Sequence, residues 1–285
     1  MEPKISVIIP THNSEKTIEN CVQSLIRQNF PRNEFEIIIV DDGSKDNTVN
    51  LAKKAGADLV VVTEPCFQGA ARNLGAKNAS GDFLSFLDSD CTARERWLEI
   101  ISMELKENDA IGGPVLNGNT NSLVAWAEYL IEFSEFHEHK KRSIVEFVPG
   151  CSQAYKKEVF FKVGGFSKQR LSEDVKIGHA LKKAGINVLF VPELQINHLC
   201  RTEFNRYIAN AKIGGKYSII ASKDVPSIYS SLSKSKWQLP IVFLIKLGAR
   251  TKRARKAKKL FKFIECFPLI LLGIGAFCSG VSQEI

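Results

Sequence analysis

The chain has 285 residues, 44% hydrophobic and 25% charged, which excludes a disordered chain and suits one large domain or a domain with an appendage. Its net charge of +8 is local, because residues 250–262 hold eight Lys or Arg and no acid while the remainder is neutral. A generally basic surface of the kind that binds nucleic acid is therefore excluded. The seven cysteines form no C-x-x-C pair and indicate free thiols in a reducing compartment.

The first third of the chain alternates between predicted strands and predicted helices. Apolar runs predict strands at residues 5–10, 35–44, 58–65 and 82–90, and the stretches after them predict helices at 14–28, 46–56, 69–80 and 93–107. We expect Ser14 to cap the first helix and Gly56 to end the second. This succession of strand–helix units predicts a doubly wound, mostly parallel α/β sheet.

Polar residues follow three of the predicted strands at the point where each strand ends. These segments are Pro10-Thr11-His12-Asn13, Asp41-Asp42-Gly43-Ser44 and Asp88-Ser89-Asp90. Ligands of open parallel sheets bind beyond the carboxyl ends of the strands. The three segments together therefore predict a binding site at one edge of the sheet.

In the stretch DFLSFLDSDC, two carboxylates, Asp88 and Asp90, directly follow a predicted buried strand. They are either a solvated turn or the ligands of a cation, because unpaired carboxylates are costly to bury. The sequence has no G-x-x-x-x-G-K-[ST] loop, and THNSE rather than G-x-G-x-x-G follows the first strand. A divalent cation is then needed to hold phosphate oxygens, and oxygen ligands suit Mg²⁺ or Mn²⁺.

Four segments in collinear order carry a family resemblance: SVIIPTHNSEKTIENCVQSLIRQ, EIIIVDDGSKDNT, GAARNLGAKNASGDFLSFLDSDC, and GGF followed by SEDVKIGHALKKAGINVLFVPELQINH. Together they resemble the family 2 glycosyltransferases of GT-A fold, over about residues 4–200. The resemblance implies a metal-dependent enzyme of the hexosyltransferase type. It would move a sugar from a nucleotide-diphosphate donor to an acceptor hydroxyl, with inversion at the anomeric carbon.

The resemblance also implies roles for the residues at the strand ends. The nucleotide-sugar would contact Pro10, Thr11, Asn13, Asp41, Asp42, Arg72 and Asp88. Asp88 and Asp90 match the metal motif of the family, with Asp90 as the more direct ligand. Two alternatives stay open: Arg72 forms a surface ion pair, or one of the Asp41-Asp42 pair caps a helix.

The second half of the chain supplies a candidate base at the start of a predicted amphipathic helix, SEDVKIGHALKKAG. Glu173 and Asp174 there could simply favour the helix dipole, an effect worth about 0.3–1 kcal/mol. Their spacing from the upstream GGF and the downstream His198 matches the family, which implies that Asp174 is the general base with Glu173 beside it. His198 would be a further metal ligand or phosphate donor, or else a structural histidine.

Two other functional classes remain as alternatives. A non-catalytic nucleotide-sugar or glycan-binding relative is disfavoured by the intact acidic set. A sugar-1-phosphate nucleotidyltransferase is disfavoured because IPTHNSEK does not resemble its glycine-rich start. The Q-x-x-R-W box of processive synthases is absent, so we expect a single transfer rather than polymer extrusion.

The C-terminal part combines apolar and basic segments. Trp237–Ala249 carries one lysine, Arg250–Lys262 is the basic run, and Cys266–Gln283 is an 18-residue stretch without charge. This pattern predicts association with the cytoplasmic membrane face, and the last segment is at the lower limit of length for a membrane span. The alternative is a helical hairpin packed on the protein.

The predicted organisation follows from these segments. Residues 1–225 would form the GT-A domain, with a nucleotide-sugar-binding half at 1–120 and an acceptor and catalytic half at 121–225. Residues 236–285 would form the membrane-associating segment. No signal peptide precedes the first strand, so we expect the domain on the cytoplasmic face, acting on a lipid-linked or membrane-borne glycan acceptor in glycolipid, cell-surface polysaccharide or glycoprotein glycan synthesis.

Overall fold

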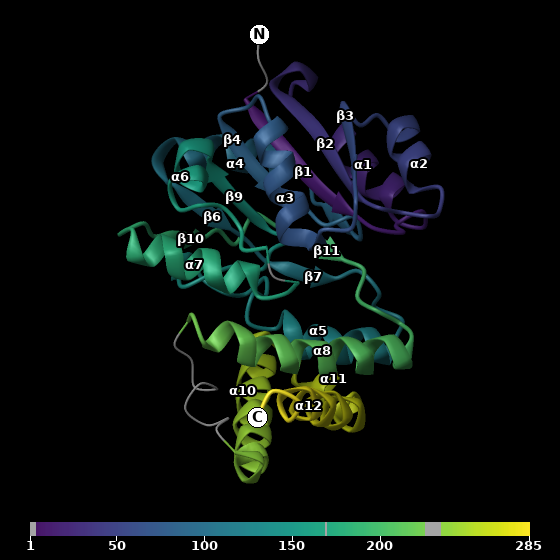
Figure 1. The fold of residues 1–285 in the computed structure, drawn as a ribbon, viewed down its shortest axis with the longest axis vertical. Helices are drawn as coiled ribbons and strands as arrows, with labels where there is room; N and C mark the ends of the chain where they lie inside the picture. Colours follow the sequence, from purple (N-terminus) through teal and green to yellow (C-terminus); the bar gives the residue numbers. More distant parts are fainter. Residues whose placement is uncertain (1–3, 169, 226–234) are drawn as a thin grey trace. The chain divides into compact units, whose positions relative to one another are not determined.

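The computed structural model describes residues 4–168, 170–225 and 235–285. The chain divides into two compact units (Figure 1): unit 1 comprises Met1–Val115 and Lys141–Asn197, and unit 2 comprises Leu116–Lys140 and His198–Ile285. This division differs from the predicted ranges 1–225 and 236–285. The reason is that helices well before residue 236 share a hydrophobic core with the C-terminal helices.

Unit 1 is built on an eight-stranded sheet of order β3-β2-β1-β4-β9-β6-β10-β8. The strands are β1 (Ile5–Thr11), β2 (Phe35–Asp42), β3 (Leu59–Thr63), β4 (Phe83–Phe86), β6 (Ala110–Gly112), β8 (Ser143–Val145), β9 (Gln153–Lys156) and β10 (Val188–Phe190). Only β9 and the edge strand β8 are antiparallel to their neighbours. The predicted α/β fold with a mostly parallel central sheet is therefore confirmed.

The helices of unit 1 are α1 (Ile18–Ile26), α2 (Thr48–Ala55), α3 (Phe67–Asn78), α4 (Trp97–Glu107), α6 (Lys157–Lys162) and α7 (Glu173–Lys183), with a short 3-10 helix at Arg32–Glu34. Gly56 ends α2 as predicted, in the left-handed conformation at φ +104°. The prediction for Ser14 was wrong, because α1 begins only at Ile18. The Ser14 carbonyl instead accepts the N–H groups of Thr17 and Ile18 in a turn before the helix.

The central strand β1 brings the polar strand ends together. Its seven residues, ISVIIPT, are all buried, because β1 pairs on both sides with parallel neighbours. Its register with β2 pairs Thr11 with Asp41, and Leu87 N donates to the carbonyl of Ile8 just beyond β4. The carboxyl ends of β1, β2 and β4 thus lie at one edge of the sheet, as the sequence predicts.

A second sheet of three short strands has the order β5-β11-β7. These strands are β5 (Cys91–Ala93), β11 (Ile196–His198) and β7 (Val115–Asn117). Hydrophobic periodicity did not predict these strands, since a strand of three residues carries too little periodic signal. They matter for the site, because β5 begins directly after Asp90.

Unit 2 is helical in its described parts. It contains α5 (Leu123–Glu132), α8 (Phe204–Ser222), α10 (Leu239–Lys256), α11 (Leu260–Glu265), α12 (Phe267–Val281) and the short 3-10 helix η2 (Lys236–Gln238). One core cluster joins residues of α5, α8, α10, α11 and α12. The glycines of α8 and α12 allow close packing: a Cβ on Gly273 would lie 1.9 Å from the Tyr207 hydroxyl, and one on Gly280 would lie 1.9 Å from the Lys212 carbonyl oxygen.

The C-terminal apolar segment forms α12, which is 15 residues long and packs against α8 and α5. Among residues 4–168, 170–225 and 235–285, no helix combines the length and apolar character required to cross a membrane. The membrane-associating part of the fold prediction is therefore not confirmed. The described contacts of α12 are those that the packed-helix alternative predicts.

Candidate active site

The first strand end is held by the buried carboxylate of Asp41. Its Oδ1 accepts from the Thr11 hydroxyl at 3.1 Å, and its Oδ2 accepts from the Ser44 N–H at 3.0 Å. Pro10 and Thr11 are buried at the end of β1. Asp41 thus joins β1 to the turn after β2 and shapes the predicted nucleotide-binding edge.

Asp42 points to a different partner, the N-terminus of α3. Its carboxylate accepts the backbone N–H groups of Cys66 and Phe67, the latter at 3.1 Å. These amides lack partners within the helix, so Asp42 satisfies donors that would otherwise be unpaired. In this structure the second aspartate of the pair stabilises a helix end.

Asn13 connects the loops that follow β1 and β2. It lies in the left-handed region at φ +51°, where asparagine is tolerated better than most residues. Its backbone N–H donates to Ser44 Oγ at 2.8 Å, and its Oδ1 accepts from Lys45 N–H at 2.9 Å. Next to it, the Ser14 hydroxyl lies 2.8 Å from the Ser89 hydroxyl, so the third strand end joins the same edge.

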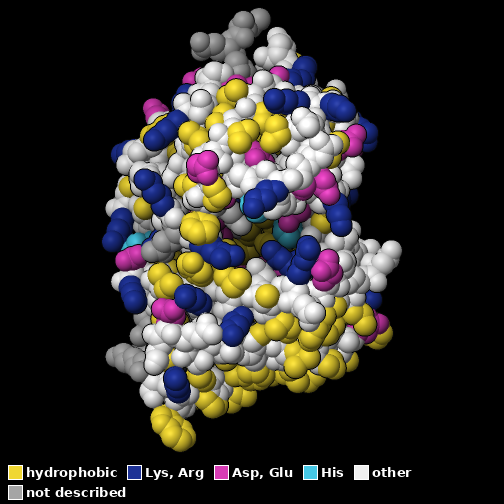
Figure 2. All heavy atoms as spheres, turned by 45° about the vertical axis from the view of Figure 1, so that its right-hand side comes forward, with side chains coloured by type: hydrophobic (Ala, Val, Ile, Leu, Met, Phe, Trp, Pro, Cys, Tyr) yellow, Lys and Arg dark blue, Asp and Glu magenta, His cyan; other side chains and the backbone are white. Residues whose placement is uncertain are grey.

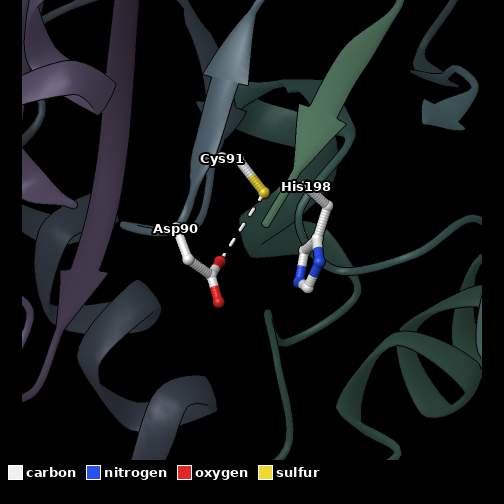
Figure 3. A group of neighbouring side chains, drawn as sticks. All are labelled: Asp90, Cys91 and His198. Carbon is white, nitrogen blue, oxygen red and sulfur yellow. Dashed lines mark hydrogen bonds between the residues drawn. The ribbon is translucent and has the colours of Figure 1, made fainter. Parts of the chain in front are cut away.

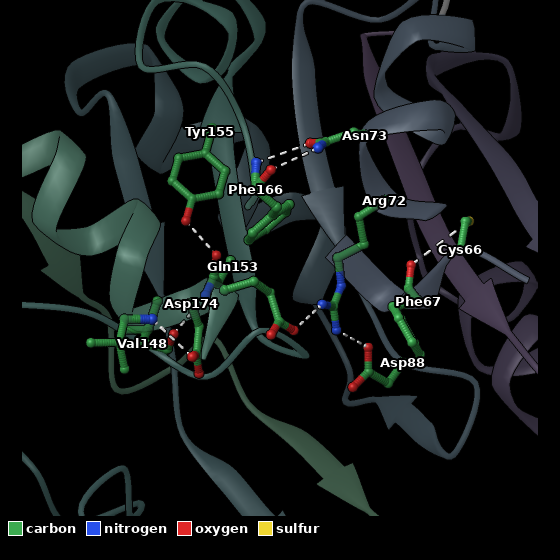
Figure 4. Close-up of polar contacts among 12 residues, drawn as sticks. Cys66, Phe67, Arg72, Asn73, Asp88, Val148, Gln153, Tyr155, Phe166 and Asp174 are labelled. Atoms are coloured by element: carbon green, nitrogen blue, oxygen red, sulfur yellow. Dashed lines mark hydrogen bonds and ion pairs between the residues drawn. The ribbon is translucent and has the colours of Figure 1, made fainter. Parts of the chain in front are cut away.

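Arg72 on α3 lies at the centre of the site and is fully buried (Figure 4). Its Nη2 donates to Asp88 Oδ1 at 2.6 Å and its Nη1 donates to Glu173 Oε1 at 2.7 Å. The guanidinium lies 5.4 Å from the centre of the Phe166 ring, and a Cβ on Gly150 would approach it to 3.2 Å. Arg72 is therefore a buried bridge between two acidic motifs, and not the surface ion pair that the sequence left open as an alternative.

The charge state of this bridge follows from its partners. Burial opposes the charged form of Arg72, but Asp88 and Glu173 hold its pKa above the usual value. Its Nε, unlike the two Nη atoms, has no hydrogen-bond partner within the described parts of the chain. Separating a buried ion pair leaves an uncompensated buried charge, which costs free energy. We therefore expect the side chains of Asp88, Arg72 and Glu173 to stay in contact.

Asp174 stands beside Glu173 in the first turn of α7. Burial, followed by the charge of Glu173, raises the pKa of Asp174 to about 7, while the Val175 N–H and Arg72 act in the opposite direction. Ser172, just before this pair, has a left-handed φ of +68°, which is uncommon for a residue other than glycine. A carboxyl group that titrates near neutral pH is suited to general-base catalysis.

A possible metal-binding group lies at the start of β5 and the end of β11 (Figure 3). Asp90, Cys91 and His198 each offer one ligand atom, and these atoms lie within 4.8 Å of one another. Burial raises the pKa of the Cys91 thiol well above its usual value, which keeps it protonated and makes it a poor ligand. The oxygen and imidazole donors of Asp90 and His198 fit a Mn²⁺ or Mg²⁺ site better than a thiolate-rich one.

Several residues of the site were missed by the sequence analysis. Asn73 fixes the loop before α7 to α3, because its Nδ2 donates to the Phe166 carbonyl at 2.8 Å and its Oδ1 accepts the Phe166 N–H at 2.9 Å. Gln153 donates to the Val148 carbonyl at 2.6 Å and accepts from the Tyr155 hydroxyl (Figure 4). The role of Asn73 could have been suspected because it directly follows Arg72. The role of Gln153 could not, because the β9 sequence QAYK matches no motif that the sequence analysis used.

Comparison with known proteins identifies the family of this chain. The family described as "Glycosyl transferase family 2" matches residues 6–164, which is more than half of the chain. Among curated proteins, the chain is 37% identical over 120 residues to the "Glycosyltransferase AglE" of Haloferax volcanii. That alignment covers 40% of each protein, so the chain matches less than half of this relative's length.

Two solved structures share the fold. A mannosyltransferase from Pyrobaculum calidifontis, in complex with GDP-Man and Mn²⁺, has a TM-score of 0.65 at 17% identity, covering 100% of this chain and 87% of the other. TarS of S. aureus in complex with UDP-GlcNAc has a TM-score of 0.57 at 19% identity, covering 99% and 91%. At these identities the likeness concerns the fold alone.

Proposed function

The chain belongs to glycosyl transferase family 2, and we propose that it is an inverting enzyme that moves one sugar from a nucleotide-diphosphate-sugar to an acceptor hydroxyl. The observation that carries this proposal is the buried bridge from Asp88 through Arg72 to Glu173, beside Asp174. It joins the acidic motif after β4 to Glu173, and the next residue, Asp174, has a pKa of about 7. The GDP-Man and UDP-GlcNAc complexes of proteins with the same fold support a nucleotide-sugar donor.

In the proposed reaction Asp174 accepts the proton of the acceptor hydroxyl. The acceptor oxygen forms the new bond to the anomeric carbon, and the bond from that carbon to the diphosphate breaks with its electron pair going to the phosphate oxygen. Attack opposite to the leaving group inverts the configuration. Burial and the charge of Glu173 keep the pKa of Asp174 high, and Arg72 holds Glu173 in place, so neither Glu173 nor Arg72 needs to exchange a proton itself.

The residues that would hold a divalent metal are Asp88, Asp90 and His198. Mn²⁺ or Mg²⁺ bound there would screen the charge of the departing diphosphate, and the Mn²⁺ in the mannosyltransferase structure supports a metal in this fold. Asp88 Oδ1 accepts from Arg72, so the bridge would position this carboxylate before the donor binds. The nucleotide would extend from there along the edge formed by Pro10, Thr11, Asn13, Asp41 and Asp42.

We further propose that the acceptor is a lipid-linked or membrane-borne glycan at the cytoplasmic membrane face. The basic run at residues 250–262 and the uncharged segment that becomes α12 support this location. The absence of a Q-x-x-R-W box from the sequence supports transfer of a single sugar.

A panel of nucleotide-sugars with Mn²⁺, read out as released nucleoside diphosphate, tests the function. We expect metal-dependent release from one class of donor, and loss of that release in Asp174→Asn at unchanged donor affinity. The opposite outcome is that the wild type binds a nucleotide-sugar but releases no nucleoside diphosphate, either with water or with a broad set of acceptor glycans. That result would favour the alternative of a non-catalytic nucleotide-sugar or glycan-binding relative.

A further inference from the structure

The outer surface of the C-terminal helices is unusually apolar. Exposed large hydrophobic side chains lie on η2, α10, α11 and α12, and we call this set the apolar patch: Trp237, Ile241, Leu244, Leu260, Phe261, Ile264, Phe267 and Leu272. Figure 2 shows hydrophobic side chains gathered over these helices, in the lower part of the view. A contiguous exposed apolar surface marks an interaction site rather than an ordinary protein surface.

These side chains are strongly exposed although their helices have well-packed inner faces. Trp237 is 91% exposed, Phe261 73% and Ile264 63%, whereas Phe263 on the same helix is buried in the core cluster. The short helix α11 therefore exposes Leu260, Phe261 and Ile264 on its outer face, beside the Lys262–Glu265 ion pair. A helix at an ordinary water-exposed surface carries polar residues on its outer face.

The outer face of α12 departs from that rule in the same way. Pro268, Leu272, Gly275 and Ser279 are its exposed positions at helical spacing, and no residue from Phe267 to Val281 is charged. The inner face packs against α8 through Gly273 and Gly280. Because the inner face is already occupied, the uncharged outer face is free to bind a further partner.

Basic side chains adjoin the apolar patch along the chain. Some of the basic run is paired within unit 2: Arg253 with Glu135, Lys259 with Glu138 at 3.2 Å, and Lys262 with Glu265 at 2.7 Å. Four exposed members form no ion pair within the described ranges, namely Lys252, Arg255, Lys256 and Lys258. They follow Ile241 and Leu244 on the same helix or at its end, so α10 is apolar in its first half and cationic in its last turns.

From this arrangement we infer that the apolar patch and these four basic residues bind an anionic lipid surface, with α10, α11 and α12 associating without crossing the bilayer. Apolar side chains would enter the headgroup boundary while Lys and Arg contact lipid phosphates. A second copy of the chain fits less well, because an identical surface would offer these four basic side chains more positive charge, whereas lipid phosphates offer negative charge. The inference deepens the proposed location of the enzyme and rests on it only for the identity of the acceptor.

Sedimentation with vesicles tests this inference on the full chain. The probes are phosphatidylcholine vesicles and phosphatidylcholine vesicles containing phosphatidylglycerol. We expect binding to the anionic vesicles that weakens in high salt but persists, because salt screens the ionic contribution alone. The variant Phe261→Ser/Ile264→Ser/Leu272→Ser should lower the partition at least about tenfold, since three exposed apolar side chains no longer enter the interface.

Two further variants separate the contributions. The quadruple variant Lys252→Gln/Arg255→Gln/Lys256→Gln/Lys258→Gln should lose the preference for anionic vesicles. The matched control Val62→Ser/Met103→Ser/Ile144→Ser removes three exposed apolar side chains of unit 1 and should bind as the wild type does. Circular dichroism and thermal unfolding confirm that each variant is folded.

Specific results would overturn the inference. The first is that the triple patch variant sediments with anionic vesicles as strongly as the wild type does. The second is that the folded wild type sediments with neither kind of vesicle. A concentration-dependent dimer that the patch variant abolishes would assign the apolar patch to a second copy instead. Donor turnover is measured without vesicles, so failure of membrane binding and failure of the proposed glycosyl transfer remain distinguishable.

Discussion

Arg72 and Glu173 form a buried ion pair between residues 101 positions apart in the sequence, with Nη1 2.7 Å from Oε1. The same guanidinium holds Asp88 at 2.6 Å. A single side chain thus connects the acidic motif after β4 to the acidic pair at the start of α7. This connection makes the charge of Arg72 part of the environment of Asp174.

Replacing Arg72 should change the pH dependence of the reaction. Arg72 lowers the pKa of Asp174, so Arg72→Met should raise that pKa and shift the acidic limb of kcat/KM to higher pH. The double variant Arg72→Met/Glu173→Gln removes the opposing charge as well and should return the limb toward the wild-type position. A merely structural Arg72 would lower activity at every pH alike, without this return.

Asp174→Asn should lower turnover by at least about 10²-fold, the lower range for loss of a general base. Donor affinity should stay nearly unchanged, because the proposed donor contacts lie at the strand ends. Calorimetry for donor binding and single-turnover kinetics measure the two quantities separately. Full turnover in this variant would reduce the Glu173-Asp174 pair to favourable charge at a helix N-terminus.

The raised pKa of Asp174 also has a consequence for stability. The folded protein binds this proton more tightly than the unfolded chain, so the contribution is present below the usual pKa and is lost as pH rises through about 7. Asp174→Asn should therefore raise Tm at pH 8 relative to the wild type, and much less at pH 4. Thermal unfolding at both pH values checks the sign, and an equal shift at the two values would contradict it.

Asp90→Ala should abolish metal-dependent nucleotide binding while the fold survives. Asp90 is partly exposed at the end of the DSD stretch, and its carboxylate lies near His198 (Figure 3). Calorimetry with UDP or GDP, with and without Mn²⁺, measures the effect. Unchanged metal-dependent affinity would exclude Asp90 as a ligand, and Asp82→Ala, at an exposed position just before β4, serves as a control outside the proposed metal group.

Two glycines of α12 offer a matched test of its packing. A Cβ on Gly280 would lie 1.9 Å from the Lys212 carbonyl oxygen, whereas a Cβ on Gly275 would meet open space. Gly280→Ala should therefore lower the stability of unit 2, because the backbones must separate. Gly275→Ala should raise it by about 0.5–1 kcal/mol, the usual gain for alanine within a helix. Denaturant unfolding followed by circular dichroism compares the two, and equal effects would mean that α12 is loosely packed.

The sequence by itself determined the parallel half of the central sheet, β3-β2-β1-β4, and its polar edge. The buried runs at β1, β2 and β4, each followed by polar residues, were sufficient, because parallel strands bring their carboxyl ends to the same edge. Gly56 was also predictable, since its left-handed conformation at a helix end is a local property. Local periodicity and local chain conformation are encoded in short stretches of sequence.

Only the tertiary structure decided what the polar residues contact. Asp41 and Asp42 are adjacent in sequence, yet one accepts from Thr11 and the other from the N-terminus of α3. Arg72 pairs with Glu173, which is about a hundred residues away in the sequence, and α12 packs against α5 and α8. These partners depend on long-range packing of complementary shapes and charges, which hydrophobic periodicity does not contain.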